Sequence, residues 1–174
     1  MKNWKELFYT EETENYCEPL FKTIGKEWTL LTAGTKESFN TMTASWATIG
    51  VFWNKPVAIC FIRPSRYTYK FIEDSEIFTM SFLGEENQEI HKICGSKSGR
   101  DTDKIKESGL IPVETINKSV SFEQARLFFE CKKIYFDELN PDFILPNNIE
   151  NMFYPKNDYH RIYFGEILNL YKKI

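Results

Sequence analysis

The sequence predicts a mainly β protein in which antiparallel strands form a closed or nearly closed barrel with short helices at its ends. Strand-like runs dominate the chain, whereas apolar residues at helical spacing occur only in short, scattered segments. The 15 Phe, 9 Tyr and 4 Trp make up 16% of the 174 residues, which is enough for a large apolar core. The length fits one domain, and the chain has no repeat or Pro-, Gly- or Ser-rich linker. Residues 1–174 are therefore expected to form a single domain.

In the first half of the chain, runs rich in Thr, Ile, Val and aromatic residues predict strands over residues 27–33, 41–53 and 57–62. Asn54-Lys55-Pro56 predicts the turn between the last two strands. Residues 2–8 predict a short amphipathic helix. Residues 65–74 predict another helix, because they follow Pro64 and carry apolar residues at helical spacing.

The second half ends in two long strands. Strands are predicted over residues 77–83, 125–139 and 161–171, and helices over residues 85–94 and near 104–108. A polar loop over residues 95–104 separates the two helices, and residues 141–155 are expected to be mostly irregular.

Composition excludes several classes of function. Twenty-two Lys and Arg against 25 Asp and Glu give a net charge of −3, which argues against a nucleic-acid partner. The least charged stretch, residues 38–62, is interrupted by Asn, Pro, Ser and Thr, so no membrane span is expected. The first twenty residues are too charged for a signal peptide, and a cytoplasmic location with four reduced cysteines is expected. With two histidines and no C-x-x-C, no metal site is expected.

Motifs for catalysis by side chains alone are missing from the sequence. It contains no G-x-S-x-G, H-E-x-x-H, P-loop or G-x-G-x-x-G, and nothing in the local sequence places His91 or His160 beside a nucleophile. If the protein is an enzyme, a bound cofactor is expected to supply the reactivity.

One segment favours an anion site. Arg63-Pro-Ser-Arg-Tyr-Thr68 brings two guanidinium groups and several hydroxyls to an expected helix N-terminus, where free N–H groups and the helix dipole favour a phosphate. Arginine also matches phosphate oxygens with two parallel hydrogen bonds. The same residues would equally suit an ordinary capped helix with solvated arginines.

Two further segments are open to two interpretations each. Asn40-Thr-Met-Thr-Ala-Ser-Trp46 places small polar side chains where a flat ligand could approach the backbone, or it is simply a Thr- and Ser-rich edge strand. Ser98-Gly-Arg-Asp-Thr-Asp-Lys104 is, taken alone, typical of a solvated loop before an Asp-capped helix.

Four segments carry a resemblance to a known family: the three described above, with the third extended back to Cys94, and His160-Arg-Ile-Tyr-Phe-Gly-Glu-Ile167. Through these segments the sequence resembles the flavin reductase-like family, most closely its flavoredoxin-like branch. They occur in the family's order and spacing, and the resemblance covers residues 28–170. It implies an FMN-binding split β-barrel with antiparallel, Greek-key-like strands. Residues 1–25 are left as an N-terminal helical extension, and residues 137–158 match nothing in the family.

The resemblance also implies roles for individual residues. It places residues 40–46 along the FMN ring and ribityl chain, residues 63–68 around the phosphate, and the 98–104 loop near the flavin of the same or a partner subunit. His160 is implied to lie near the flavin face, where it would position or polarise rather than act as an obligatory acid. The expected cofactor-binding residues are Asn40, Met42, Thr43, Ala44, Ser45, Trp46, Arg63, Ser65, Arg66, Tyr67, Thr68, Ser98, Gly99, Arg100 and Lys104.

The resulting hypothesis is an FMN-dependent oxidoreductase. It would take hydride from NAD(P)H onto FMN, pass the electrons to an unidentified acceptor, and form a homodimer with the cofactor near the interface, as family members usually do. Two alternatives stay open: a flavoredoxin-type electron carrier without NAD(P)H turnover, and a non-catalytic barrel that binds a ligand or a partner protein. A pyridoxal-phosphate oxidase-like activity occurs on the same type of barrel but fits these motifs less well.

Overall fold

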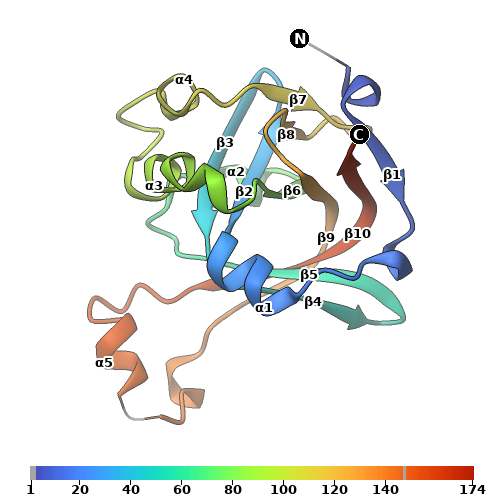
Figure 1. Ribbon diagram of the computed structural model, residues 1–174. Coiled ribbons are helices and arrows are strands. Elements are labelled where there is room, and N and C mark those ends of the chain that lie inside the picture. Colours follow the sequence, from blue (N-terminus) through green and yellow to red (C-terminus); the bar gives the residue numbers. More distant parts are fainter. Residues whose placement is uncertain (1–2, 147) are drawn as a thin grey trace.

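The strands form a curved antiparallel sheet that wraps around the core (Figure 1). This computed structural model describes residues 3–146 and 148–174. The strands run in the order β3-β2-β6-β9-β10-β5-β4, and β1 pairs with β10 beside this path. Their bounds are β1 Phe8–Glu11, β2 Thr29–Thr35, β3 Ser38–Ala44, β4 Ala47–Phe52, β5 Lys55–Ile62, β6 Ile77–Phe82, β9 Leu127–Glu138 and β10 Arg161–Lys173. The mainly β, antiparallel fold predicted from the sequence is confirmed.

The seam of the barrel lies at Ser45-Trp46. β3 pairs with β2 and β4 pairs with β5, so these consecutive strands stand at opposite ends of the sheet order. Because only two residues connect them, the two ends of the sheet must meet there, and the sheet curls into a barrel. The prediction of one strand over residues 41–53 is therefore wrong. Strand-forming residues continue through the segment, but the change of pairing partner at the seam breaks it in two.

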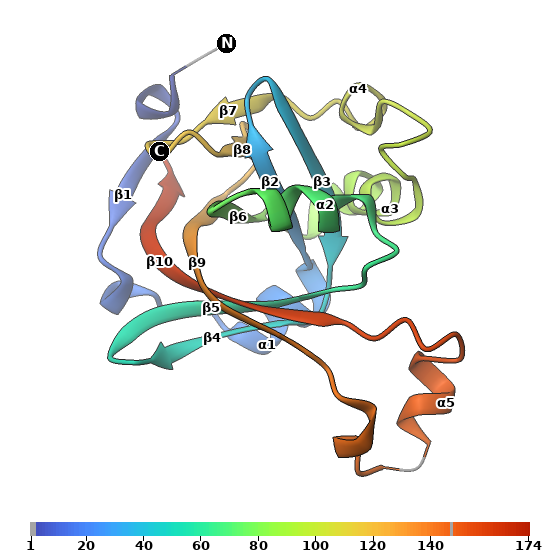
Figure 2. The same cartoon turned by 180° about the vertical axis from the view of Figure 1, so that it is seen from behind.

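Helices cover one side of the barrel near β2 and β3 (Figure 2). α2 (Tyr67–Asp74) and α3 (Gln88–Ser96) contact both strands, and α4 (Lys104–Ser108) packs on α3. A small hairpin of β7 (Pro112–Glu114) and β8 (Val120–Phe122), which the sequence did not predict, forms a separate sheet. No helix among residues 3–146 and 148–174 has the length and apolar character that crossing a membrane requires.

The core fills the barrel with aromatic and aliphatic side chains from the inward faces of its strands. Phe78, Phe129 and Tyr163 are each at most 1% exposed. Gly165 on β10 makes room for one of them, since a β-carbon there would lie 2.5 Å from the Phe78 ring and 2.7 Å from the Cys131 side chain. The β9–β10 register shifts between Phe164 and Gly165, so this glycine also lies at an irregularity between the two longest strands.

The N-terminal segment joins the barrel more closely than the helical extension expected over residues 1–25. Helical turns occur at Trp4–Glu6, Thr13–Asn15 and α1 (Leu20–Lys22), but β1 pairs with β10 because Phe8 is buried in the core. Residues 1 and 2 lie outside the described part of the chain. The helical extension expected over residues 1–25 thus has helical turns in its described part and also adds a strand to the sheet.

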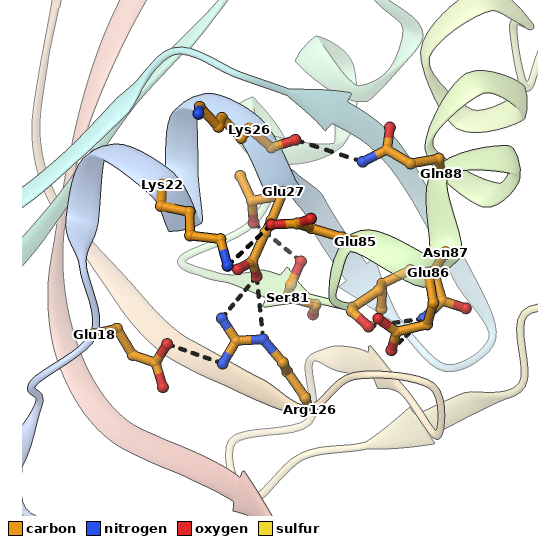
Figure 3. Close-up of polar contacts among 12 residues, drawn as sticks. Glu18, Lys22, Lys26, Glu27, Ser81, Glu85, Glu86, Asn87, Gln88 and Arg126 are labelled. Carbon is orange, nitrogen blue, oxygen red and sulfur yellow. Dashed lines mark hydrogen bonds and ion pairs between the residues drawn. The ribbon is translucent and has the colours of Figure 1, made fainter.

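Arg126, immediately before β9, holds the start of β2 in place (Figure 3). Its Nη2 and Nε donate to Glu27 at 2.7 and 3.1 Å, and its Nη1 lies 3.1 Å from a Glu18 oxygen. Lys22 and Glu85 form a further ion pair at 3.0 Å beside them. This network fixes the π-helix at Thr23–Glu27 that leads into β2. It lies apart from the candidate site described below, because none of its residues lines the cavities there.

Residues 139–146 and 148–160 project from the barrel between β9 and β10 (Figures 1 and 2). They contain a short 3-10 turn at Pro141–Phe143 and helix α5 (Ile149–Phe153), and are otherwise irregular in their described part. Phe143 and Leu145 on this excursion are 78% and 85% exposed, so little apolar burial holds its tip. Its base, in contrast, packs against the barrel near the seam, where Phe153 contacts Trp46.

Candidate functional site

The segments singled out in the sequence meet at two adjoining cavities beside the seam. The first, of about 190 Å³, is lined by Met42, Thr43, Ala44, Ser45, Trp46, Phe61, Arg63, Arg66 and His160. The second, of about 170 Å³, is lined by Ser65, Arg66, Tyr67, Thr68, Ser96, Lys97, Ser98, Arg100 and Lys104. Arg66 lines both, so the two cavities form one continuous candidate site. Of the residues expected from the sequence, only Asn40 and Gly99 line neither.

Asn40 and Gly99 lie directly behind the second cavity. Both line a larger hollow of about 710 Å³, which shares Tyr67, Arg100 and Lys104 with that cavity. Asn40 is 5% exposed, and its Nδ2 donates to Thr68 Oγ1 at 2.7 Å. Asn40 therefore ties β3 to the first turn of α2.

The second cavity contains two buried or partly buried cations, Arg66 and Lys104, that have no acidic partner among the described residues. The Arg66 guanidinium forms no hydrogen bond or ion pair with any described side chain or carbonyl group, and burial, followed by the nearby Arg63, lowers its pKa. Lys104 is 4% exposed, and among residues 3–146 and 148–174 its Nζ donates only to the carbonyl oxygens of Cys94 and Lys97, each at 3.4 Å. Burial lowers the pKa of Lys104 to about 8. A buried cation is costly unless it is paired, so this arrangement favours an anionic ligand.

Backbone geometry at α2 points to the same chemistry. Arg66 is the N-cap residue of this eight-residue helix, in extended conformation, and no side chain caps the helix N-terminus. Such an end carries positive dipole charge and backbone donors. The alternative of an ordinary capped helix with solvated arginines does not describe this end of α2, because the cap is missing and Arg66 is partly buried.

The loop after α3 closes over the start of α2. Arg100 Nη1 donates to the Ser65 carbonyl oxygen at 3.2 Å, and the guanidinium lies 4.9 Å from the centre of the Tyr67 ring. Asp103 caps α4 by accepting from the Lys106 amide at 3.1 Å, as the sequence indicated. This segment is thus both a capped helix start and one wall of the cavity.

The first cavity lies between the seam and β5. Small side chains of Thr43, Ala44 and Ser45 form one wall, and Phe61 and Arg63 form another. Thr43 Oγ1 donates to the His91 carbonyl oxygen at 2.7 Å, which fixes β3 against α3. The wall of small side chains leaves room for a planar ligand close to the backbone.

His160 stands at the edge of the first cavity, 8% exposed, with its ring 4.9 Å from the Trp46 ring. Its Nδ1 lies 2.8 Å from the Tyr154 hydroxyl. Burial, and then the charge of Arg63, lowers the pKa of His160 to about 4. At neutral pH the imidazole is uncharged. It can therefore position or polarise a ligand, but it carries no extra proton to donate as a general acid.

The sequence did not predict the individual contacts that the 139–160 excursion makes with the site residues. The carbonyl oxygen of Phe153 accepts from Arg63 Nη2 at 2.7 Å, Tyr154 contacts His160, and Asp158 accepts from Ser65 Oγ at 2.6 Å. The chain pattern gave no signal for the contacts of Arg63 and Ser65, because they join segments about 90 residues apart. Phe61 was also missed, although strand alternation puts it on the same face as Arg63 and could have found it.

Metal chemistry has no support in the described ranges 3–146 and 148–174. They contain no group of three His, Cys, Asp or Glu side chains placed to hold a metal ion. The four cysteines are free thiols, and Cys17 is the exposed one among them.

This fold is that of the FMN-binding, flavin reductase-like barrels. The chain belongs to the flavin reductase-like family, because the model of the family described as "Flavin reductase like domain" matches residues 21–171. The resemblance inferred from the four motifs is thereby confirmed. No protein with a curated description matches the chain.

Solved structures agree with this fold at low sequence identity. An FMN-binding domain of a flavin reductase-like enzyme from Shewanella baltica aligns with a TM-score of 0.68 and 17% identity, over 95% of this chain and 76% of that one. Flavoredoxin of Desulfovibrio vulgaris gives 0.64 and 20%, over 92% and 75% of the two chains. An NADH:FAD oxidoreductase of Streptomyces globisporus gives 0.64 and 16%, over 84% and 75%.

Proposed function

We propose that this protein binds FMN across the two cavities and acts as an oxidoreductase that takes hydride from NAD(P)H and passes electrons to an acceptor. The observation that carries the proposal is the pair of partly or fully buried cations, Arg66 and Lys104, which have no acidic partner in the described chain. They line the cavity at the uncapped start of α2, which adjoins a cavity walled partly by small side chains. A phosphate joined to a planar ring system satisfies both features at once.

The residues present fit the parts of FMN. Arg66 and Lys104 hold the phosphate together with the start of α2, and Asn40 keeps Thr68 in place behind them. The small side chains at residues 43–45 let the ring approach the backbone. When bound, FMN supplies hydride acceptance and electron transfer, so no side-chain base is needed for that chemistry. Trp46, which lines the first cavity, packs against Phe153, with the ring centres 5.2 Å apart.

Support for the electron donor comes from family membership and from a structural neighbour named as an NADH:FAD oxidoreductase. Other neighbours are named as flavoredoxins, which favours the alternative of an electron carrier without NAD(P)H turnover. The first measurement is the visible spectrum of the purified protein after titration with FMN and then anaerobic addition of NADH. Bleaching of the flavin band supports the reductase. A band that does not bleach with NADH or NADPH supports the carrier, and no band at all contradicts both.

The phosphate assignment is tested by the replacement Arg66→Gln. Loss of charge-assisted hydrogen bonds to phosphate, worth about 1.5–3 kcal/mol each, corresponds to a loss of FMN affinity of about 10- to 100-fold. Riboflavin, which lacks the phosphate, serves as the comparison ligand and is expected to lose little. Lys70→Gln on the exposed side of the same helix is the matched control. Equal losses for FMN and riboflavin would show that Arg66 does not read the phosphate.

A homodimer is also part of the proposal. Ile59 and Phe61 on β5 and Ile162 and Phe164 on β10 are half-buried neighbours in register, on the sheet face opposite the core. Phe61 also lines the first cavity, so a second copy covering this face would lie beside the ligand. Sedimentation equilibrium of Phe164→Glu tests this and is expected to give a monomer. Phe143→Glu, which changes an exposed apolar residue on the excursion, is expected to leave the dimer intact.

A further inference from the structure

Tyr154 and His160 form an isolated hydrogen-bonded pair at the edge of the first cavity. The Tyr154 hydroxyl lies 2.8 Å from His160 Nδ1, and the two residues are 5% and 8% exposed. Tyr154 directly follows α5 on the excursion, whereas His160 directly precedes β10. Among described residues neither side chain has another hydrogen-bond partner. The direction of this one bond therefore decides which nitrogen of the imidazole carries the hydrogen.

The surroundings of the pair favour the phenol as the donor. Its guanidinium lies 5.2 Å from the centre of the Tyr154 ring, and its charge opposes protonation of His160. Burial raises the pKa of the Tyr154 phenol, while the charge of Arg63 acts in the opposite direction, so the phenol keeps its hydrogen and can donate it to the more basic imidazole nitrogen. A neutral imidazole has one acceptor nitrogen and one N–H group. If Nδ1 accepts from Tyr154, the hydrogen of the imidazole must be on Nε2.

We propose that Tyr154 is a positioning residue that holds neutral His160 as its Nε2–H tautomer, so that the imidazole presents a hydrogen-bond donor to an acceptor atom of a planar heterocycle in the first cavity. Nδ1 is occupied by Tyr154, and Nε2 is the nitrogen left for a ligand, since His160 lines that cavity. With a flavin ring as the heterocycle, this donor favours the reduced, more electron-rich ring over the oxidised one. That last step rests on the proposed function, whereas the tautomer itself does not.

The tautomer is measured on the ligand-free protein by two-bond proton–nitrogen correlation NMR near neutral pH. The chain has only two histidines, so His91→Gln assigns the signals of His160. The wild type is expected to show the Nε2–H form alone, and Tyr154→Phe a mixture of both forms. The Nδ1–H form in the wild type would overturn the proposal, and so would an unchanged spectrum in Tyr154→Phe.

Tyr159→Phe is the matched control, because its hydroxyl donates to Glu150 and not to His160. It is expected to leave the tautomer of His160 unchanged. Phenylalanine at position 154 keeps the ring that packs against Arg63 and Tyr159, and a thermal melt like that of the wild type establishes that the variant is folded. A change in the tautomer without a change in the fold separates positioning from a structural role.

The redox consequence is measured as the midpoint potential of bound FMN. Tyr154→Phe is expected to shift this potential to a more negative value, and Tyr159→Phe to leave it in place. An unchanged potential in Tyr154→Phe would overturn the inference that the tautomer of His160 affects the bound flavin ring. If the protein binds no flavin, the proposed function fails, but the NMR experiment still decides the tautomer. The two failures are therefore distinguishable.

Discussion

Gly99 lies so close to Asn40 that a β-carbon at position 99 would stand 2.3 Å from Asn40 Oδ1. Asn40 cannot easily retreat, because it is buried and donates to Thr68 at 2.7 Å. One contact thus joins the loop after α3, the strand β3 and the first turn of α2. These are the three segments that the sequence motifs had marked separately. The contact places the walls of the second cavity relative to one another.

Gly99→Ala is expected to weaken FMN binding and to destabilise the fold. The new methyl group must displace the Asn40 amide, and overpacking of this kind costs typically about 1–3 kcal/mol. Isothermal titration with FMN and urea unfolding measure the two effects. Gly25→Ala is the control, since nothing lies within 4 Å of a β-carbon there. Unchanged affinity and stability in Gly99→Ala would show that the loop adjusts freely and does not define the cavity.

From the lowered pKa of Lys104 we expect stability and ligand binding to depend on pH in opposite directions. Its pKa is about 8 in the folded protein against an ordinary value of 10.5, so between these values the unfolded chain binds more protons. The contribution of Lys104 to stability of the free protein therefore rises as the pH rises through this range. FMN affinity falls over the same range, by up to about tenfold per pH unit, because the phosphate prefers a protonated Lys104.

Lys104→Met is expected to remove both pH dependences and to weaken FMN, with little or no loss of stability in the free protein. Urea unfolding and FMN titration at several pH values between 7.5 and 10 measure them, as differences between wild type and variant. Lys106→Met, on the exposed side of the same helix, is the control. An FMN affinity with the same pH dependence in wild type and Lys104→Met would contradict the role of Lys104.

The two histidines predict a loss of stability in mild acid. Burial lowers the pKa of His91 and of His160 to about 4 in each case, against an ordinary value of 6.5. Below pH 6.5 the unfolded chain takes up protons that the folded protein does not, so the free energy of unfolding falls as the pH falls toward 4. Each histidine contributes a slope of up to about 1.4 kcal/mol per pH unit.

Urea unfolding between these pH values measures the slope, and His91→Gln is expected to remove about half of the histidine contribution. NMR titration of the free protein gives the individual midpoints. A histidine that titrates near its ordinary pKa would refute the assignment of that residue as a neutral, buried group. For His160 it would also reopen a role as a proton donor.

Replacement of Glu130 is expected to change the stability of the protein without affecting the candidate site. This fully buried carboxylate accepts from the Asn117 amide and side chain and from Asn169, each at 2.9 Å, from Tyr171 at 3.1 Å, and from Thr115. Glu130→Gln turns one acceptor oxygen into a donor that faces other donors. The expected loss is about 2 kcal/mol in the free energy of unfolding, because bonds to a charged acceptor are lost.

Urea unfolding measures this loss, and FMN affinity is expected to stay unchanged because none of these partners lines the two cavities. Glu114→Gln, which affects only the 3.4 Å ion pair with Lys118 near the surface, is the control. A variant as stable as the wild type would show that burial of the charge costs as much as its hydrogen bonds contribute.

Local patterns predicted most elements of the fold but not the way in which they pair. Strand residues run without interruption through positions 41–53, so only the pairing of β3 with β2 and of β4 with β5 reveals the break at Ser45-Trp46. Phe8 is a second example of an element that local pattern does not predict. The sequence pattern predicts an amphipathic helix there, whereas burial against β10 makes Phe8 the start of a strand.

The sequence by itself determined the antiparallel β class, the family motifs and the residue types that suit a phosphate, because these depend on alternation, spacing and side-chain chemistry within short segments. Only the tertiary structure decided that Arg66 and Lys104 lack an acidic partner among the residues it describes, that Gly99 meets Asn40, and that Tyr154 contacts His160. These relationships join segments distant in the chain or depend on burial. Burial and charge compensation follow from the whole packed barrel, and no local pattern contains them.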